Sequence, residues 1–278
     1  TKQDSELEER LEVFRLSLSE AEKKALSEDT AALKAYQSEK DSAEDLAKLP
    51  VLEISDIDKN AERLNASLED GIIFSEADTS GIAYIRVMFD TDGFNEDEVQ
   101  FAALLKDLFG EMNTSEHSYS DLFDEILLTT GGVSFKLDSF PTRERPGAEV
   151  GFKGLCSIEL RVLEDRIGDG LKLLSEMLND TVLDDTERLS ELLNEGKSQQ
   201  RAAIEGAMHK AAVTRAASYF SDAQRYHDLA TGIAYYDFIN AASRLSKQPV
   251  HMKRLIKTLK SIRERLFSRE RVSFALYG

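Results

Sequence analysis

The chain has 278 residues with a formal net charge of −17, and 41% of its residues are hydrophobic while 31% are charged. This composition is ordinary for a globular protein, and no apolar run approaches the ~20 residues of a membrane-spanning helix. The negative charge argues against nucleic-acid binding, which needs clustered Lys and Arg, and favours cationic partners such as basic peptides. A simpler interpretation is that the charge serves solubility.

The charge is unevenly distributed along the chain. Residues 241–278 hold ten Lys/Arg against two Glu, a net +8, so residues 1–240 carry −25. The basic segment has apolar residues at helical spacing, which is typical of an ordinary core-facing helix with a solvated basic side.

Residues 1–50 are expected to form a helical hairpin that acts as a linker. Two apolar stripes at helical spacing run through it: Leu7, Leu11, Phe14 and Leu18, then Leu26, Leu33 and Tyr36. Breaks are possible near Ser19 or Ser27, and two antiparallel helices would account for the pattern. Pro50 ends the helical segment, because proline cannot continue a helix.

The domain that follows, residues 51–278, begins with a predicted pair of strands at Gly71–Phe74 and Gly81–Asp90. The second strand alternates, with four apolar residues on one side: Ala83, Ile85, Val87 and Phe89. Asn95 is a predicted N-cap for an acidic helix start, since its side chain can accept from the first backbone N–H groups. The helix then runs over Glu96–Phe109.

A second helix from Tyr119 is followed by Thr130-Gly131-Gly132 and an alternating strand. The expected inner residues of the helix are Leu122, Phe123, Ile126 and Leu127, and those of the strand are Val133, Phe135 and Leu137. Two glycines after a helix supply the positive φ at which other residues are strained. One of Gly131 and Gly132 is therefore predicted to have φ > 0.

The remaining predicted elements are a turn, one long strand, four helices and a last strand. They are Pro141–Gly147 (turn), Val150–Val162, Ile167–Leu178, Asp185–Phe220, Tyr235–Leu245, Val250–Phe267 and the strand through Val272, Phe274 and Leu276. Strands grouped with helices, without strict alternation, predict an α+β fold with a largely antiparallel sheet packed by helices.

No residue of this chain is predicted to be catalytic, to bind a cofactor or to ligate a metal. The inverted zinc motif H-x-x-E-H needs two histidines one helical turn apart. The four histidines are His117, His209, His227 and His251, and none has another histidine three to five residues away.

Other candidate chemistry is also weak. Cys156, the single cysteine, lies among apolar strand residues and is expected to be an inert core thiol. Tyr226-His227-Asp228 offers a base with an orienting carboxylate but no nucleophile, and a surface His beside Asp is the favoured interpretation. Gly131-Gly132 lacks the context of a phosphate loop, and Gly168-Asp169-Gly170 lies in a helical pattern.

Several segments, in the same order, resemble the presequence protease branch of the pitrilysin/insulinase zinc metalloproteases. They are Leu33–Gln37, Ser42–Pro50, Ser55–Ile57, Thr79–Asp90, the Tyr119–Ser139 element, Arg215–Phe220 and Gly232–Ile239. The resemblance implies that the chain holds the end of the family's helical hairpin and its third, non-catalytic peptidase-like domain. The helix placed to carry a zinc motif, Glu96–Phe109, has no histidine.

The resemblance implies an internal segment of a zinc-dependent peptidase that encloses and degrades unfolded, possibly basic, peptides. Zinc would belong to the parent enzyme and not to this segment, whose role would be hinge and chamber wall. The expected partners are the remaining domains of the same polypeptide and peptides, with no nucleic acid and no membrane. The single cysteine suits a reducing, cytoplasmic compartment. The alternative is a stand-alone helical scaffold or interaction module without a proteolytic role.

Overall fold

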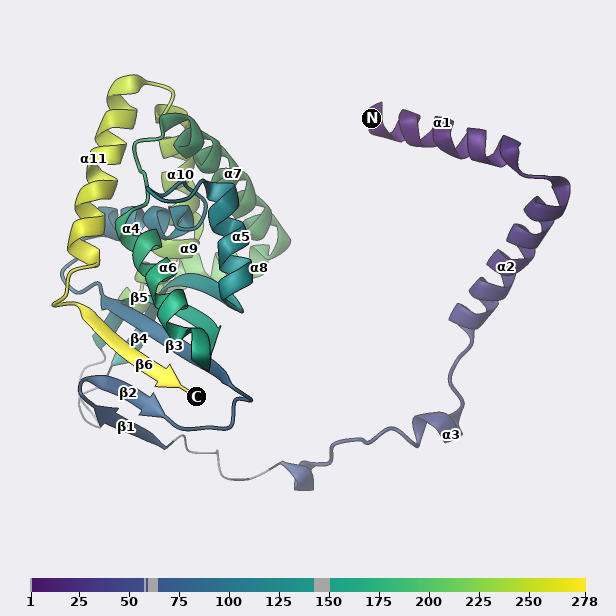
Figure 1. Cartoon of the computed structure of the whole chain (residues 1–278), viewed down its shortest axis with the longest axis horizontal. Helices are drawn as coiled ribbons and strands as arrows, with labels where there is room; N and C mark the ends of the chain where they lie inside the picture. The colour runs from purple at the N-terminus through teal and green to yellow at the C-terminus, as the bar shows by residue number, and fades with distance from the viewer. Residues whose placement is uncertain (1, 58, 60–64, 143–150) are drawn as a thin grey trace. The chain divides into compact units, whose positions relative to one another are not determined.

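The computed structural model describes residues 2–57, 59, 65–142 and 151–278, with side chains described from residue 10 onward (Figure 1). The chain divides into two compact units, Thr1–Arg63 and Leu64–Gly278. We call the first the arm and the second the α+β unit. The expected boundary after residue 50 stays a prediction, because clustering of the backbone is not a test of independent folding.

The arm contains three helices, α1 (Lys2–Ser17), α2 (Glu20–Ser38) and α3 (Ala43–Leu46), and a short 3-10 turn at Ile54–Asp56. Ser19 caps α2 in a capping box: its hydroxyl accepts from the Glu22 N–H at 3.3 Å, and the Glu22 carboxylate accepts from the Ser19 N–H at 2.8 Å. The helical break therefore lies at Ser19, while Ser27 is inside α2.

The apolar stripes of the arm are exposed. Five of their side chains are each more than half exposed: Leu11, Phe14, Leu26, Leu33 and Tyr36. None of the described side chains from residue 10 to residue 57 is buried. The helices are confirmed, but within these residues they have no core of their own.

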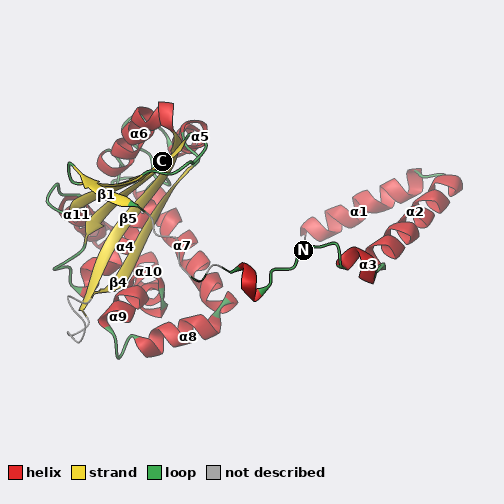
Figure 2. Ribbon diagram, turned by 90° about the horizontal axis from the view of Figure 1, so that it is seen from below, coloured by secondary structure: helices red, strands yellow, loops and turns green. Residues whose placement is uncertain are grey.

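The α+β unit is built on a six-stranded sheet in the order β1-β2-β6-β3-β5-β4 (Figure 2). The strands are β1 (Ala66–Glu69), β2 (Ile72–Ser75), β3 (Ile82–Asp90), β4 (Gly132–Thr142), β5 (Gly151–Leu163) and β6 (Val272–Tyr277). All neighbours are antiparallel except β2 and β6, which run parallel. The predicted α+β class with a largely antiparallel sheet is confirmed.

The core lies on one face of the two central strands. Ile85 of β3 is directly opposite Leu160 of β5, Val87 is opposite Ile158, and Phe89 is opposite Cys156. The inner residues of both strands are at most 8% exposed. The opposite face is polar, where the carboxylate of Glu159 pairs with Arg86 at 2.5 Å and with Lys136 at 2.7 Å. Strict alternation thus fixes which side of the sheet receives the helices.

One predicted strand pairing was wrong. The segments Gly71–Phe74 and Gly81–Asp90 do form β2 and β3, but β6 lies between them and pairs with both. A strand from the C-terminal end of the chain thus completes the centre of the sheet. Proximity in sequence indicated a hairpin, while the long-range pairing of β6 takes its place.

Eight helices accompany the sheet in the described part of this unit. They are α4 (Glu96–Leu108), α5 (Tyr119–Thr129), α6 (Ile167–Asn179), α7 (Thr186–Gly206), α8 (Met208–Ala217), α9 (Asp222–Thr231), α10 (Ile233–Leu245) and α11 (Pro249–Leu266). The predicted single helix Asp185–Phe220 is two helices that break at Ala207, whose backbone is non-helical. Strand β1 and helix α9 were not predicted. No described helix has the length and apolarity to cross a membrane.

The Tyr119–Ser139 element forms as expected, with one difference. Gly132 has φ +123°, which confirms the predicted positive φ, and β4 alternates as predicted with Leu137 buried. On α5, Leu122 is buried, but Phe123 and Leu127 are 54% and 61% exposed. The core stripe predicted for this helix is therefore narrower than expected. Of the predicted turn Pro141–Gly147, Pro141 and Thr142 end β4 and residues 143–147 lie outside the described residues.

Candidate functional site

Helix α4, where the resemblance places a zinc motif, is a core helix. Asn95 caps it in a capping box with Glu98, and the carboxylate of Glu96 accepts from Arg225 at 2.8 Å. Its inner residues are all buried: Val99, Ala102, Ala103, Leu104, Leu105 and Leu108. The carboxylates of its first turn thus serve the helix end and an ion pair. Beyond that turn, α4 contains no histidine and no glutamate.

Tyr226-His227-Asp228 does not form a catalytic set. Tyr226 is buried and its hydroxyl is 3.1 Å from Thr91 Oγ1, while the described hydrogen bonds of the His227 side chain are with Thr231. The favoured surface interpretation is wrong for Asp228, which is fully buried. Arg215 donates to its carboxylate at 2.7 Å.

The buried Asp228 pair was missed by sequence reasoning. Arg215 lies on α8 and Asp228 on α9, and the N–H of Ala234 donates to the same carboxylate at 3.4 Å from the start of α10. One aspartate therefore joins three consecutive helices. Because Arg and Asp are both common surface residues, neither composition nor spacing marks such a pair.

Cys156 is fully enclosed on β5, and burial raises the pKa of its thiol to about 12. At neutral pH the thiol is protonated, so it is a poor nucleophile and a poor ligand. This agrees with the expected inert core residue. Gly168 and Gly170 lie inside α6, as predicted, and not in a phosphate-binding loop.

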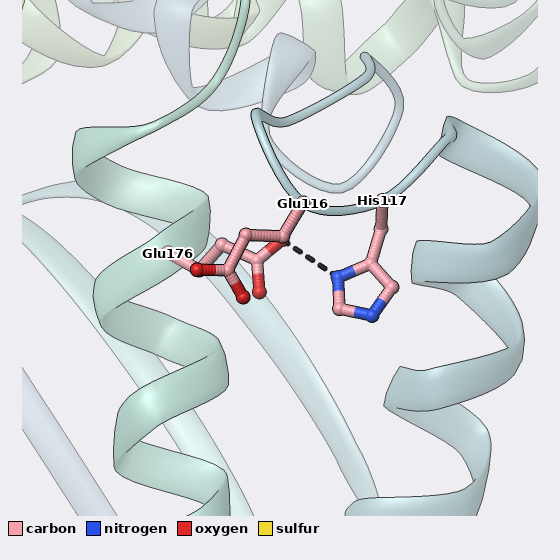
Figure 3. A group of neighbouring side chains, drawn as sticks. All are labelled: Glu116, His117 and Glu176. Carbon is pink, nitrogen blue, oxygen red and sulfur yellow. Dashed lines mark hydrogen bonds and ion pairs between the residues drawn. The ribbon is translucent and has the colours of Figure 1, made fainter.

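The structure does bring one group of potential metal ligands together. Glu116 and His117 lie in the loop between α4 and α5, and Glu176 lies near the end of α6 (Figure 3). One ligand atom from each of the three residues lies within 4.8 Å of the others. His117 Nδ1 is 2.8 Å from Glu176 Oε1, and Figure 3 shows the Glu116 side chain directed toward the same carboxylate.

Thr114 organises this group. Its hydroxyl donates to Glu176 Oε1 and accepts from the backbone N–H of His117 at 2.9 Å and of Glu116 at 3.3 Å. The loop is also tied to the chain after α6, because the N–H of Ser115 donates to the Asp180 carbonyl at 3.1 Å. A single buried threonine therefore contacts all three residues of the group.

The electrostatics of this group favour a cation. The hydrogen bond to Glu176 raises the pKa of His117 above its usual value, because the carboxylate stabilises the charged imidazole. Glu176 is 9% exposed, so its carboxylate is a buried charge that needs a partner. Without a metal, a protonated His117 supplies that partner. With a metal, the same oxygen and nitrogen atoms are ordinary ligands.

The search for zinc-type spacing could not find this group. Thr114, Glu116 and His117 are close in sequence, but Glu176 is about sixty residues away and on another helix. The signal available in the sequence is an adjacent Glu-His pair before a helix cap, which is common in proteins. Only the packing of α6 beside the loop brings the third residue in.

Comparison with known proteins supports a peptidase-related origin. Residues 1–241 match the family described as associated with peptidase M16, subfamily C. "Protein HypA" of Clostridium perfringens is 28% identical over 281 residues, which is 100% of this chain and 28% of that protein. The mitochondrial presequence protease of Yarrowia lipolytica is 25% identical over 235 residues, 83% of this chain and 23% of that protein.

The chain thus spans about a quarter of the length of the curated relatives it matches. A solved structure described as a peptidase M16 inactive domain from Pseudomonas fluorescens superposes with a TM-score of 0.48 at 17% identity. That superposition covers 77% of this chain and 47% of the other. The assignment rests on the sequence matches and not on this superposition.

Proposed function

The chain belongs to the family associated with peptidase M16, subfamily C, and from that premise we propose that it is an internal, non-catalytic segment of a zinc-dependent peptidase. In this role it is the hinge and one wall of a chamber that encloses and degrades unfolded peptides. The observation that carries the proposal is helix α4. It stands where the resemblance places a zinc motif, yet its body is filled with buried apolar side chains.

Zinc and catalysis belong, on this proposal, to other domains of the same longer polypeptide. Its relatives include presequence proteases several times longer than the chain, which supports the presence of further domains as partners. A peptidase-like fold that lacks the ligands still supplies a shaped surface. It can exclude water and restrict the size of what reaches the zinc.

The hinge role is supported by the arm. Its described helices are held by local caps and bury no side chain, whereas the α+β unit has its own core. A segment of this kind takes its stability from whatever covers its apolar stripes, and it is suited to changing partners during a conformational change.

The proposed substrates are unfolded peptides, with a preference for basic ones. The support is the −25 carried by residues 1–240. Charge of this size acts at long range, is screened by salt and affects the association rate more than the final affinity. We also propose a reducing, cytoplasmic location, which suits the single buried free thiol of Cys156.

The alternative function is a stand-alone helical scaffold or interaction module, which the exposed stripes of α1 and α2 favour. The reading frame on either side of these residues separates the two. An H-x-x-E-H motif upstream supports the peptidase, and a start codon directly before the arm with no such motif supports the module.

The test of peptide enclosure uses the longer polypeptide and two quenched fluorescent peptides, one basic and one neutral. Exposed carboxylates are reversed to Lys one face at a time: Asp121 with Asp124 on α5, and Glu187 with Glu191 on α7. For the face that lines the chamber, kcat/KM for the basic peptide should fall several-fold, the neutral peptide should be unaffected, and added salt should reduce the difference. Equal losses for both peptides, or no effect of salt, would refute charge steering.

A further inference from the structure

We propose that Glu116, His117 and Glu176 form a binding site for a divalent transition-metal ion, with Zn²⁺ as the preferred occupant. The site lies between the α4–α5 loop and α6, away from helix α4 where the family's zinc motif would stand. It departs from the sequence-based expectation that the chain holds no metal ligand. That expectation considered only histidines that lie close together in sequence.

The donor set and its spacing fit zinc. One imidazole nitrogen and two carboxylates are a common zinc ligand combination, and a fourth position remains for water. His117 Nδ1 and Glu176 Oε1 are 2.8 Å apart, and all three donor atoms lie within 4.8 Å of one another. Ligands of a tetrahedral zinc ion at ~2.0–2.1 Å are separated by a little over 3 Å, so small side-chain adjustments close the site.

The group is already oriented by neighbouring contacts. Metal sites depend on outer hydrogen bonds that fix the direction of their ligands. Thr114 provides these bonds, since it donates to Glu176 and accepts from the N–H groups of Glu116 and His117. The carboxylate of Glu176 is almost fully buried and therefore has little freedom to turn away.

The surrounding cleft is negatively charged. It has a volume of about 680 Å³, and five carboxylates line it against the two permanently cationic side chains Arg166 and Lys172. The carboxylates are those of Glu116, Glu125, Asp169, Glu176 and Asp180. Such a cleft raises the local concentration of cations.

A simple ion pair between His117 and Glu176 accounts for part of the geometry. It does not account for Glu116, whose carboxylate turns toward a second carboxylate although like charges repel (Figure 3). A metal ion makes this convergence favourable, because both carboxylates become ligands. When the ion binds, it takes the place of the Nδ1 proton of His117, and that proton passes to solvent.

The expected role of the metal is structural. By joining the α4–α5 loop to α6, a bound ion stabilises the folded state over the unfolded chain, in which no preformed site exists. The open fourth position lies in a cleft at the surface, so exchange with solvent metal is expected to be fast. Neither consequence requires the chain to hydrolyse peptides.

The test is zinc binding by the metal-free 278-residue chain, followed by calorimetry and by thermal unfolding with and without Zn²⁺. Co²⁺ serves as a spectroscopic probe, because its visible absorption reports a tetrahedral site with nitrogen and oxygen ligands. We expect one ion per chain, a higher Tm in zinc, and loss of both effects in His117→Ala. Glu116→Gln, at an exposed residue, should weaken binding at least ~10-fold without loss of fold.

Thr114→Val tests the orientation of the ligands and should weaken binding by ~10–100-fold. The matched control is His251→Ala, which removes an exposed histidine on α11 and should bind zinc like the unaltered chain. Circular dichroism confirms that each variant is folded. The proposal is overturned if the unaltered chain binds no stoichiometric zinc, or if His117→Ala and Glu116→Gln bind it as well as the control does.

Discussion

Leu33 of α2 and Leu105 of α4 both belong to apolar stripes of capped helices, but Leu33 is 54% exposed and Leu105 is fully buried. Both helices begin with a capping box, Ser19 with Glu22 in the arm and Asn95 with Glu98 in the α+β unit. Helix formation is thus encoded locally in both regions, since caps and spacing act within one or two turns. Burial is not, because it requires a second surface.

The difference separates two sources of stability. In the α+β unit, α4 packs against the sheet and against other helices, so its apolar side chains leave water. In the arm, the described side chains contribute caps and short-range ion pairs, such as Arg15 with Glu12 at 2.6 Å. Exposed pairs of this type contribute little to stability.

The largest expected effect comes from deleting equivalent leucines in the two regions. Leu105→Ala should reduce the free energy of unfolding by ~2–5 kcal/mol, because it leaves a cavity in the core. Leu33→Ala should change it by no more than ~0.5 kcal/mol, as is usual at the surface. Urea unfolding followed by circular dichroism measures both. A large loss for Leu33→Ala would break the comparison, since it would mean that α2 is covered in solution.

The next effect concerns charge. Asp228→Asn removes the buried partner of Arg215 and should cost ~1.5–3 kcal/mol, the range for a hydrogen bond to a charged group. The control is Glu12→Gln in the exposed pair of the arm, for which no measurable change is expected. Both are compared by thermal unfolding at the same ionic strength. If the two variants melt alike, the burial of Asp228 does not strengthen its ion pair.

The smallest effect is at the two glycines before β4. Gly132→Val should cost ~1–2 kcal/mol through left-handed strain, because Gly132 has φ +123°. An added Cβ there would also lie 2.8 Å from Arg161 Nη2. Gly131→Val should cost less, since its Cβ would lie no closer than 3.5 Å to Arg161. Thermal melts of both variants decide, and an equal or larger loss for Gly131→Val would contradict the assignment.

Local patterns predicted much of the fold correctly. Alternation in β3 and β4 identified which residues face the core, and Asn95 marked the start of α4. The predicted positive φ fell at Gly132. These features depend on neighbours within a few residues, so the sequence is sufficient for them.

Other features depended on contacts between distant segments. The insertion of β6 between β2 and β3 overrode the expected hairpin, and α9 was hidden because its caps are ordinary polar residues. The candidate metal group needed α6 to bring Glu176 beside His117. The buried state of Asp228 needed α8 to supply Arg215.

The sequence by itself thus determined the class of fold, the absence of a zinc motif and most helix and strand positions, because periodicity, caps and glycine conformations are short-range. It also carried the family resemblance, since the matching segments keep their order along the chain. Only the tertiary structure decided which strands are neighbours, which apolar stripes are buried and which polar groups meet. Those outcomes arise from pairs of surfaces far apart in sequence, and no local pattern encodes the partner.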